Sequence, residues 1–161
     1  MGVTSLTVTV NGVLPETVSK ICGGITYQGK QYKGLEAAEI LIAQQGKGIR
    51  KAAALGMVIK INIVLIPGIN DAEIGKIAET VKEWGANLVN IIPLIPQYQL
   101  HDFPAPDCGQ IMAAREAAEK HLTAFRHCQH CRADAIGVPG KTEYRESVYE
   151  DLLAESNFSH G

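Results

Sequence analysis

Two cysteines near the C-terminus, Cys128 and Cys131, have the spacing of a metal or iron–sulfur site. They form the motif Cys-Gln-His-Cys, and His127 and His130 lie beside them. Two thiolates at this spacing can hold one metal, but structural zinc and iron–sulfur sites normally take four protein ligands. The pair is therefore half of a ligand set, the anchor of an exchangeable cluster, or two inert or zinc-scavenging thiols.

The residues around this motif are basic and suit a bound thiolate. Arg126, Arg132 and the two histidines would favour the ionised thiols and stabilise the negative charge of a cluster. The histidines would ligate the metal, donate hydrogen bonds to the site or face solvent. Arg132 and Asp134 would either order the loop as an ion pair or remain solvated.

The other two cysteines, Cys22 and Cys108, have no partner nearby in the sequence. We expect both to be small buried hydrophobic residues. The alternative for Cys22 is a third cluster ligand, because the adjacent Gly23 and Gly24 would permit a close approach.

The composition limits the classes of protein to which the chain could belong. The chain has 161 residues, of which 46% are hydrophobic and 20% charged, which predicts one globular domain. The net charge of −2 argues against a nucleic-acid-binding protein. No apolar run approaches the ~20 residues of a membrane helix, and no signal peptide is recognisable. With a reduced CxxC motif, these features predict a cytoplasmic protein.

The apolar periodicity predicts an α/β fold with parallel strands and crossover helices. The run from Val58 to Ile66 is nearly all apolar, which predicts a strand buried on both faces. Asn70 or Asp71 is expected to cap the helix that follows it, and Trp84 is expected in the core. The expected strands are 5–10, 58–66 and 88–94, the expected helices are 16–21, 35–55, 71–84 and 108–125, and a hairpin is expected at 27–32.

Five stretches of the sequence together resemble the NifB family of radical-SAM maturases in nitrogenase cofactor assembly. The resemblance extends from about Gly2 to Gly140, and its most specific part is the closing CxxCRADAxG. The stretches are Thr7 to Asn11, Glu36 to Glu39 with Gln44 and Gln45, Lys60 to Asn62 with Leu65 to Asp71, Asn90 to Ile95, and Arg126 to Gly137.

The resemblance implies a partial (βα) radical-SAM barrel, TIM-like in architecture, of which this chain is the C-terminal half. It also implies S-adenosylmethionine and a [4Fe–4S] cluster as cofactors, and the insertion of a carbide as [4Fe–4S] units are fused into the eight-iron precursor. Cys128 and Cys131 would help to hold a substrate cluster. The expected partners are iron–sulfur cluster donors and cofactor carrier proteins of nitrogenase assembly, with no nucleic acid and no membrane.

Amides at strand positions are candidate cofactor ligands within that barrel. Asn11, Asn62 and Asn90 would hydrogen-bond the ribose or the amino-acid portion of the cofactor, and Pro93 would contact adenine. The alternatives are a turn amide for Asn11 and a packed, satisfied amide for Asn62. An unpaired buried amide at Asn62 would cost on the order of 1–3 kcal/mol, which favours a function.

The resemblance assigns three parts to the chain. Residues 1–100 are the partial barrel, residues 101–140 carry the loop, helix and CxxC cluster-binding segment, and residues 141–161 are a polar tail. The chain departs from the family pattern at Ser5, Leu14 and Cys22, where His, Asp and an aromatic residue are expected. It also lacks the family's CxxxCxxC, which suggests a truncated gene, a split product or an incomplete sequence.

Two other hypotheses compete with the maturase. In one, the chain is a noncatalytic iron–sulfur or metal carrier that uses its CxxC to deliver clusters to a separate enzyme. In the other, it is a nonfunctional gene remnant that aggregates through unpaired strand edges. Without CxxxCxxC, we expect that the isolated chain cannot cleave S-adenosylmethionine.

Overall fold

A computed structural model of the chain describes residues 3–125, 137–138 and 142–143. The chain forms two compact units, Met1–Arg126 and His127–Gly161. In the second unit the described residues form two short antiparallel strands, β6 (Gly137–Val138) and β7 (Thr142–Glu143). The predicted CxxC site and most of the predicted polar tail therefore lie outside the described residues.

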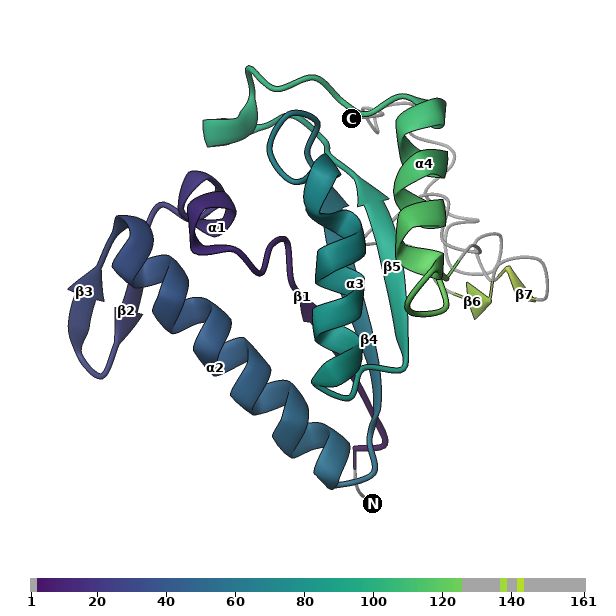
Figure 1. Ribbon diagram of the computed structural model, residues 1–161, viewed down its shortest axis with the longest axis horizontal. Helices are drawn as coiled ribbons and strands as arrows, with labels where there is room; N and C mark the ends of the chain where they lie inside the picture. Colours follow the sequence, from purple (N-terminus) through teal and green to yellow (C-terminus); the bar gives the residue numbers. More distant parts are fainter. Residues whose placement is uncertain (1–2, 126–136, 139–141, 144–161) are drawn as a thin grey trace, which may run out of the picture. The chain divides into compact units, whose positions relative to one another are not determined.

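Three parallel strands form the sheet of the first unit (Figure 1). They are β1 (Ser5–Thr9), β4 (Val58–Leu65) and β5 (Leu88–Pro93), and β4 lies in the middle. Both pairings are parallel, and each strand reaches the next through helical segments. The predicted α/β class with parallel strands and crossover helices is confirmed, whereas a barrel stays a prediction.

The helices and the hairpin follow the predicted order. The elements are α1 (Pro15–Ile21), β2 (Ile25–Tyr27), β3 (Lys30–Tyr32), α2 (Gly34–Ala54), the 3-10 turn η1 (Asp71–Glu73), α3 (Ile74–Glu83), the 3-10 turn η2 (Tyr98–Leu100) and α4 (Cys108–Glu119). The β2–β3 hairpin turns at Gln28 and Gly29, both with positive φ. Such a two-residue turn matches the twist of the strands. No helix within these described parts is long and apolar enough to cross a membrane.

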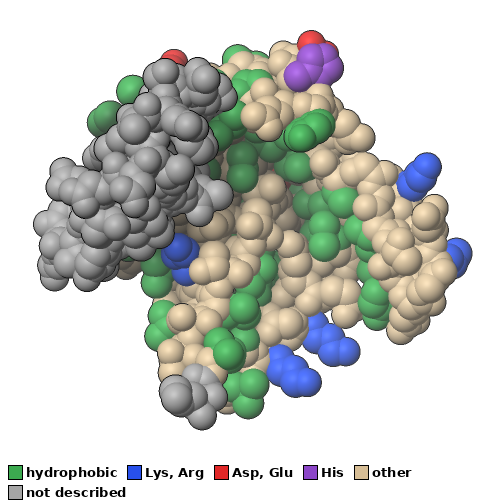
Figure 2. Space-filling view, turned by 180° about the vertical axis from the view of Figure 1, so that it is seen from behind, with side chains coloured by type: hydrophobic (Ala, Val, Ile, Leu, Met, Phe, Trp, Pro, Cys, Tyr) green, Lys and Arg blue, Asp and Glu red, His purple; other side chains and the backbone are tan. Residues whose placement is uncertain are grey.

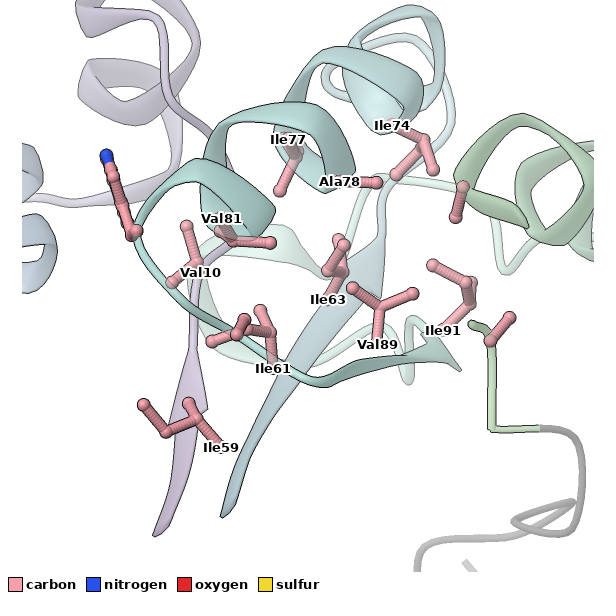
Figure 3. Close-up of a cluster of buried hydrophobic side chains, with 14 of the residues drawn as sticks. Val10, Ile59, Ile61, Ile63, Ile74, Ile77, Ala78, Val81, Val89 and Ile91 are labelled. Atoms are coloured by element: carbon pink, nitrogen blue, oxygen red, sulfur yellow. The ribbon is translucent and has the colours of Figure 1, made fainter. Parts of the chain in front are cut away.

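The hydrophobic core lies between the sheet and its helices. On β4, alternate residues have no exposed surface, and Ile59, Ile61 and Ile63 are among them. Figure 3 shows side chains of α3 and the strands gathered in this core. The α3 residues at helical spacing that are fully buried are Ile74, Ile77, Ala78 and Val81. Trp84 is 6% exposed, so its predicted place in the core is confirmed.

The prediction that β4 is buried on both faces is wrong. Its burial alternates along the strand, and Lys60, Asn62 and Val64 are only half-buried. Successive side chains of a strand point to opposite faces, so these three lie on the face away from the core. Lys60 and Asn62 interrupt the apolar run with a period of two, which is the pattern of a half-exposed strand.

Two further boundary predictions are corrected by the structure. Neither Asn70 nor Asp71 caps α3, because η1 precedes it and Glu73 takes the N-cap position. The helix predicted to reach Phe125 ends at Glu119. Beyond it, Ala124 forms a parallel bridge with Val89, since the outer edge of β5 offers hydrogen bonds to the returning chain. The backbone at Thr123–Phe125 thus lies beside β5 and runs in its direction.

Candidate functional site

A row of polar side chains crosses the face of the sheet that points away from the core described above. Thr9, Asn62 and Asn90 are aligned by strand register, one on each strand. The Asn90 Nδ2 donates a hydrogen bond to the Asn62 Oδ1 at 3.3 Å. Figure 2 looks at the molecule from behind, where green hydrophobic side chains lie among tan polar side chains and backbone.

Asn90 has an unused hydrogen-bond acceptor in this row. Its side chain is 1% exposed, and its Oδ1 has no hydrogen-bond partner among the described residues. A buried carbonyl left without a donor costs on the order of 1–3 kcal/mol. The Asn62–Asn90 pair is therefore suited to receive an N–H or O–H group from a bound molecule.

Asn11 and Asn70 join the ends of β1 and β4. The Asn11 Oδ1 accepts a hydrogen bond from the Val64 N–H at 2.9 Å. Asn70 is fully buried, and its Nδ2 donates to the Asn11 and Val64 carbonyl oxygens at 2.9 and 2.8 Å. Its Oδ1 accepts from the Ile66 N–H at 2.8 Å. The Asn11 Oδ1 thus binds a backbone group of β4 that is 53 residues away, which is not the turn amide that the sequence offered as an alternative, and the cofactor contact stays a prediction.

Glu73 holds the loop after β1 from the other side. Its Oε1 accepts hydrogen bonds from the Val13 and Leu14 N–H groups at 2.7 and 2.8 Å. Leu14 stands at the N-cap of α1 and supplies no side-chain cap. A carboxylate at this helix start is favourable, because the N-terminus of a helix carries a partial positive charge. Glu73, which is 6% exposed and belongs to η1, therefore serves as the cap at the start of α1.

A pocket of about 260 Å³ lies at the C-terminal end of β1. Thr9, Asn11 and Gln45 supply its polar wall, and the Gln45 Nε2 donates a hydrogen bond to the Thr9 carbonyl at 2.8 Å. Its remaining lining residues are Gly12, Val18, Ile21, Cys22 and Leu41. The pocket thus combines two side-chain amides with an apolar wall.

The remaining candidates are dispersed. Pro93, the last residue of β5, pairs with Leu65 and is half-buried. Cys22 is half-buried in the pocket wall, and Cys108 is exposed at the start of α4, so the prediction that both are buried is wrong. Cys128 and Cys131, with their neighbouring histidines and arginines, lie outside the described residues. Within those residues no three metal-binding side chains converge.

Lys60 brings a positive charge to the open face. Its Nζ lies 5.6 Å from the centre of the Phe125 ring, a cation–π distance. Lys60 lies on β4, and Phe125 directly follows Ala124, which bridges β5. The sequence did not predict this contact, because Lys60 and Phe125 are far apart along the chain and no local pattern links them.

Comparisons with known proteins found relatives over almost the whole chain. The chain is 42% identical over 157 residues to FeMo cofactor biosynthesis protein NifB of Methanocaldococcus infernus. It is 39% identical over 166 residues to the protein of that name from Methanocaldococcus jannaschii. The matches cover 98% and 99% of this chain but 52% and 55% of those relatives, so the chain spans about half their length. It matches 34% of the Klebsiella pneumoniae protein of the same name, at 39% identity. No protein-family model matches the chain.

Proposed function

We propose that this chain, a homologue of the NifB proteins over almost its whole length, takes part in FeMo-cofactor biosynthesis. The observation that carries the proposal is the 42% identity to the Methanocaldococcus infernus protein across 98% of the chain. The proposed reaction is radical-SAM-dependent carbide insertion with fusion of [4Fe–4S] units into the eight-iron precursor. The chain would work there together with a CxxxCxxC segment, which its own sequence does not contain.

Cys128 and Cys131 are the proposed anchor of the substrate cluster. The assignment is supported by the resemblance of Arg126 to Gly137 to the family's closing CxxCRADAxG segment and by the basic residues beside the two thiols.

Asn62 and Pro93 are the proposed S-adenosylmethionine contacts, with Asn11 at the end of β1. The Asn90 Nδ2 donates to Asn62, and its buried Oδ1, which has no partner among the described residues, fits a hydroxyl or amino group of that cofactor. Pro93 and Ile92 offer apolar contact at the end of β5. When bound, S-adenosylmethionine would supply the methyl group and the radical chemistry, and these residues would bind and orient it.

The same homology supports an architecture, a location and a set of partners for the chain. The parallel sheet would be part of a (βα) barrel, and the chain would act in the cytoplasm. Its partners would be iron–sulfur cluster donors and cofactor carrier proteins, with no nucleic acid and no membrane involved.

The anchor can be tested by anaerobic reconstitution with iron and sulfide. We expect the unmodified chain to bind iron and sulfide in equal amounts, with the visible absorption of a thiolate-bound cluster. The double variant Cys128→Ala/Cys131→Ala should lose most of the bound iron. Cys108→Ala is the matched control, because Cys108 is exposed on α4, and it should keep the full amount. Equal iron in the double variant and the unmodified chain would reject the anchor.

The competing carrier hypothesis shares the CxxC but needs no nucleotide pocket. Calorimetric titration with S-adenosylhomocysteine separates the two hypotheses. Saturable binding to the reconstituted chain supports a cofactor wall, whereas cluster binding without any nucleoside binding favours the carrier.

A further inference from the structure

We propose that Lys60 and Asn90 form a subsite for a small oxyanion that keeps one O–H group, such as hydrogen phosphate or bicarbonate. The Lys60 ammonium would bind the charge of the anion, and the Asn90 side-chain oxygen would accept its O–H. The inference concerns the face of the sheet that points away from the core, but it depends neither on cofactor binding nor on the cysteine pair.

Lys60 is the one charged side chain on the three strands of the sheet, because β1, β4 and β5 contain no other Asp, Glu, Lys or Arg. It is half-buried. The ion pairs within the described part of the chain join Lys76 to Glu79 and His101 to Asp102, so Lys60 has no counter-charge there. A charge that is partly withdrawn from water gains from an anionic partner.

The Lys60 ammonium is held on the β5 side of its strand. Its Nζ lies 5.6 Å from the centre of the Phe125 ring. Phe125 follows Ala124, which bridges Val89 on the far edge of β5, so in this parallel alignment Phe125 stands beside Asn90. Val89 and Ala124 are buried, which places Phe125 and Asn90 together on the opposite face. The ammonium therefore lies toward the part of β5 that carries Asn90.

Asn90 offers an acceptor that only a ligand can satisfy. Its Nδ2 donates to the Asn62 Oδ1 at 3.3 Å, which leaves the Asn90 Oδ1 as the free end of the amide. That oxygen has no partner among the described residues, and the side chain is 1% exposed. An amide oxygen has two lone pairs, so it can accept the O–H of an oxyanion beside a group of the proposed cofactor.

The spacing of the two residues fits one small ligand. Lys60 pairs with Leu88, and Asn90 lies two residues further along β5 on the same face. The two backbone positions are therefore about 7 Å apart along the strands and about 5 Å apart across them. A lysine side chain is long enough to cover most of this separation, so the ammonium and the amide oxygen can meet different oxygens of the same oxyanion.

A free oxyanion fits this position better than the carboxylate of S-adenosylmethionine. Lys60 lies near the N-terminal start of β4, whereas Asn11 and Pro93, two of the proposed cofactor contacts, stand at or beyond the C-terminal ends of their strands. Ligands of parallel α/β sheets bind at the C-terminal ends. The subsite is therefore deeper on the face than the cofactor, and we expect the two ligands to bind together.

The combination of one cation and one acceptor predicts selectivity among anions. Hydrogen phosphate and bicarbonate keep an O–H at neutral pH, and each can donate it to the Asn90 oxygen. Sulfate has no O–H under these conditions, so it would leave the buried acceptor unsatisfied and place an oxygen against it. The subsite should therefore distinguish phosphate from sulfate although the two anions have similar size and shape.

Nuclear magnetic resonance titration of the full, metal-free chain at pH 7 and constant ionic strength tests the selectivity. Potassium phosphate and potassium bicarbonate should shift the side-chain amide signals of Asn62 and Asn90 and the ammonium signal of Lys60, with saturation in the millimolar range. Potassium sulfate should bind at least about tenfold more weakly. The absence of saturable shifts, or equal affinity for phosphate and sulfate, would overturn the proposal.

Variants of Lys60 test the role of its charge. Lys60→Met keeps an unbranched side chain without the charge and should weaken phosphate binding at least about tenfold, whereas Lys60→Arg should bind within a few-fold of the unmodified chain. Lys82→Met, on the exposed face of α3, is the matched control and should bind normally. Normal phosphate binding by folded Lys60→Met would reject the subsite. If Lys60→Met does not fold, the comparison of phosphate with sulfate still decides.

A competition experiment separates this inference from the proposed function. Saturating S-adenosylhomocysteine should leave phosphate binding in place, because the two ligands occupy different depths of the face. Displacement of phosphate would assign the Asn90 oxygen to the cofactor alone and overturn the subsite. Phosphate binding by a chain that binds no S-adenosylhomocysteine would support the subsite and count against the proposed cofactor wall.

Discussion

Two polar side chains that are distant from β1 in the sequence fix the loop that leaves it. Asn70 uses both of its amide hydrogens and its oxygen within that junction, and Glu73 accepts two backbone N–H groups from it. Both side chains are buried, so each bond replaces one that water cannot supply. The position of Asn11 at the sheet edge is therefore set by residues about 60 positions away.

Replacing Glu73 should test how much this junction contributes to stability. Glu73→Ala leaves the Val13 and Leu14 N–H groups without their acceptor, so we expect a loss of about 2–3 kcal/mol in the free energy of unfolding. Glu73→Gln keeps an acceptor oxygen and should lose about 1 kcal/mol or less. Urea unfolding followed by circular dichroism measures both.

Glu79→Ala is the control for this comparison. Glu79 lies on the exposed face of α3 and pairs with Lys76 at 3.0 Å, where both side chains are well exposed. Such a surface pair contributes little, so its loss should change stability by less than about 0.5 kcal/mol. A Glu73→Ala variant as stable as this control would refute the role assigned to Glu73.

The sequence singled out Asn62 and Asn90 as candidate site residues, but it did not reveal the roles of Glu73 and Asn70. Asn62 and Asn90 are conspicuous because an amide within an apolar strand needs a partner. Glu73 and Asn70 looked like ordinary polar residues at a helix start, since their partners lie on a different element. The one signal available was Leu14, whose position before α1 lacks a capping side chain and so requires an acceptor from elsewhere.

At the scale of elements, local pattern predicted the α-helices and strands of the first unit, though not β6 and β7, and it predicted their existence better than their burial and their ends. The β4 run has the apolar content of a fully buried strand, yet Lys60 and Asn62 fall on one face and leave it open. Helical periodicity through Phe125 was overridden after Glu119, because the edge of β5 binds the backbone of the returning chain. Pairing between distant segments produces no hydrophobic periodicity that could be recognised in the sequence.

The two glycines inside α2 make a matched pair that tests helix propensity against packing. Gly46 is buried, and a Cβ there would lie 3.0 Å from the Trp84 ring, which Arg50 also contacts. At Gly48 a Cβ would meet nothing within 4 Å. By helix propensity alone a glycine at position 46 would only weaken the helix, but the structure gives Gly46 a packing role.

Alanine substitutions at these positions should therefore have opposite effects. Gly48→Ala should raise the free energy of unfolding by about 0.5–1 kcal/mol, because alanine favours the helix. Gly46→Ala gains the same preference but crowds Trp84, and overpacking costs about 1–3 kcal/mol. We expect thermal and urea unfolding to rank Gly48→Ala above the unmodified chain and Gly46→Ala below it. A Gly46→Ala variant as stable as Gly48→Ala would contradict the contact with Trp84.

At the scale of the whole molecule, the first unit buries one face of its sheet and leaves other surfaces unfinished. The core face of β4 is fully covered, while Lys60, Asn62 and Val64 on its other face are only half-buried, and no described strand pairs with the outer edge of β1. A stable core with one open edge and an orphaned buried acceptor is what a part of a larger site would show. The relatives, about twice as long as their matched part, are consistent with that view.

This incompleteness leads to a prediction about activity. Reductive cleavage of S-adenosylmethionine needs a cluster with one open iron, which the resemblance assigns to a CxxxCxxC motif. The four cysteines here stand at positions 22, 108, 128 and 131, and none has that spacing. After anaerobic reconstitution and reduction, the isolated chain should therefore form no 5′-deoxyadenosine above the protein-free background, as measured by liquid chromatography. Turnover that disappears in Cys128→Ala/Cys131→Ala would show instead that the late CxxC supports the radical-generating cluster, and the division of labour proposed for these thiols would fail.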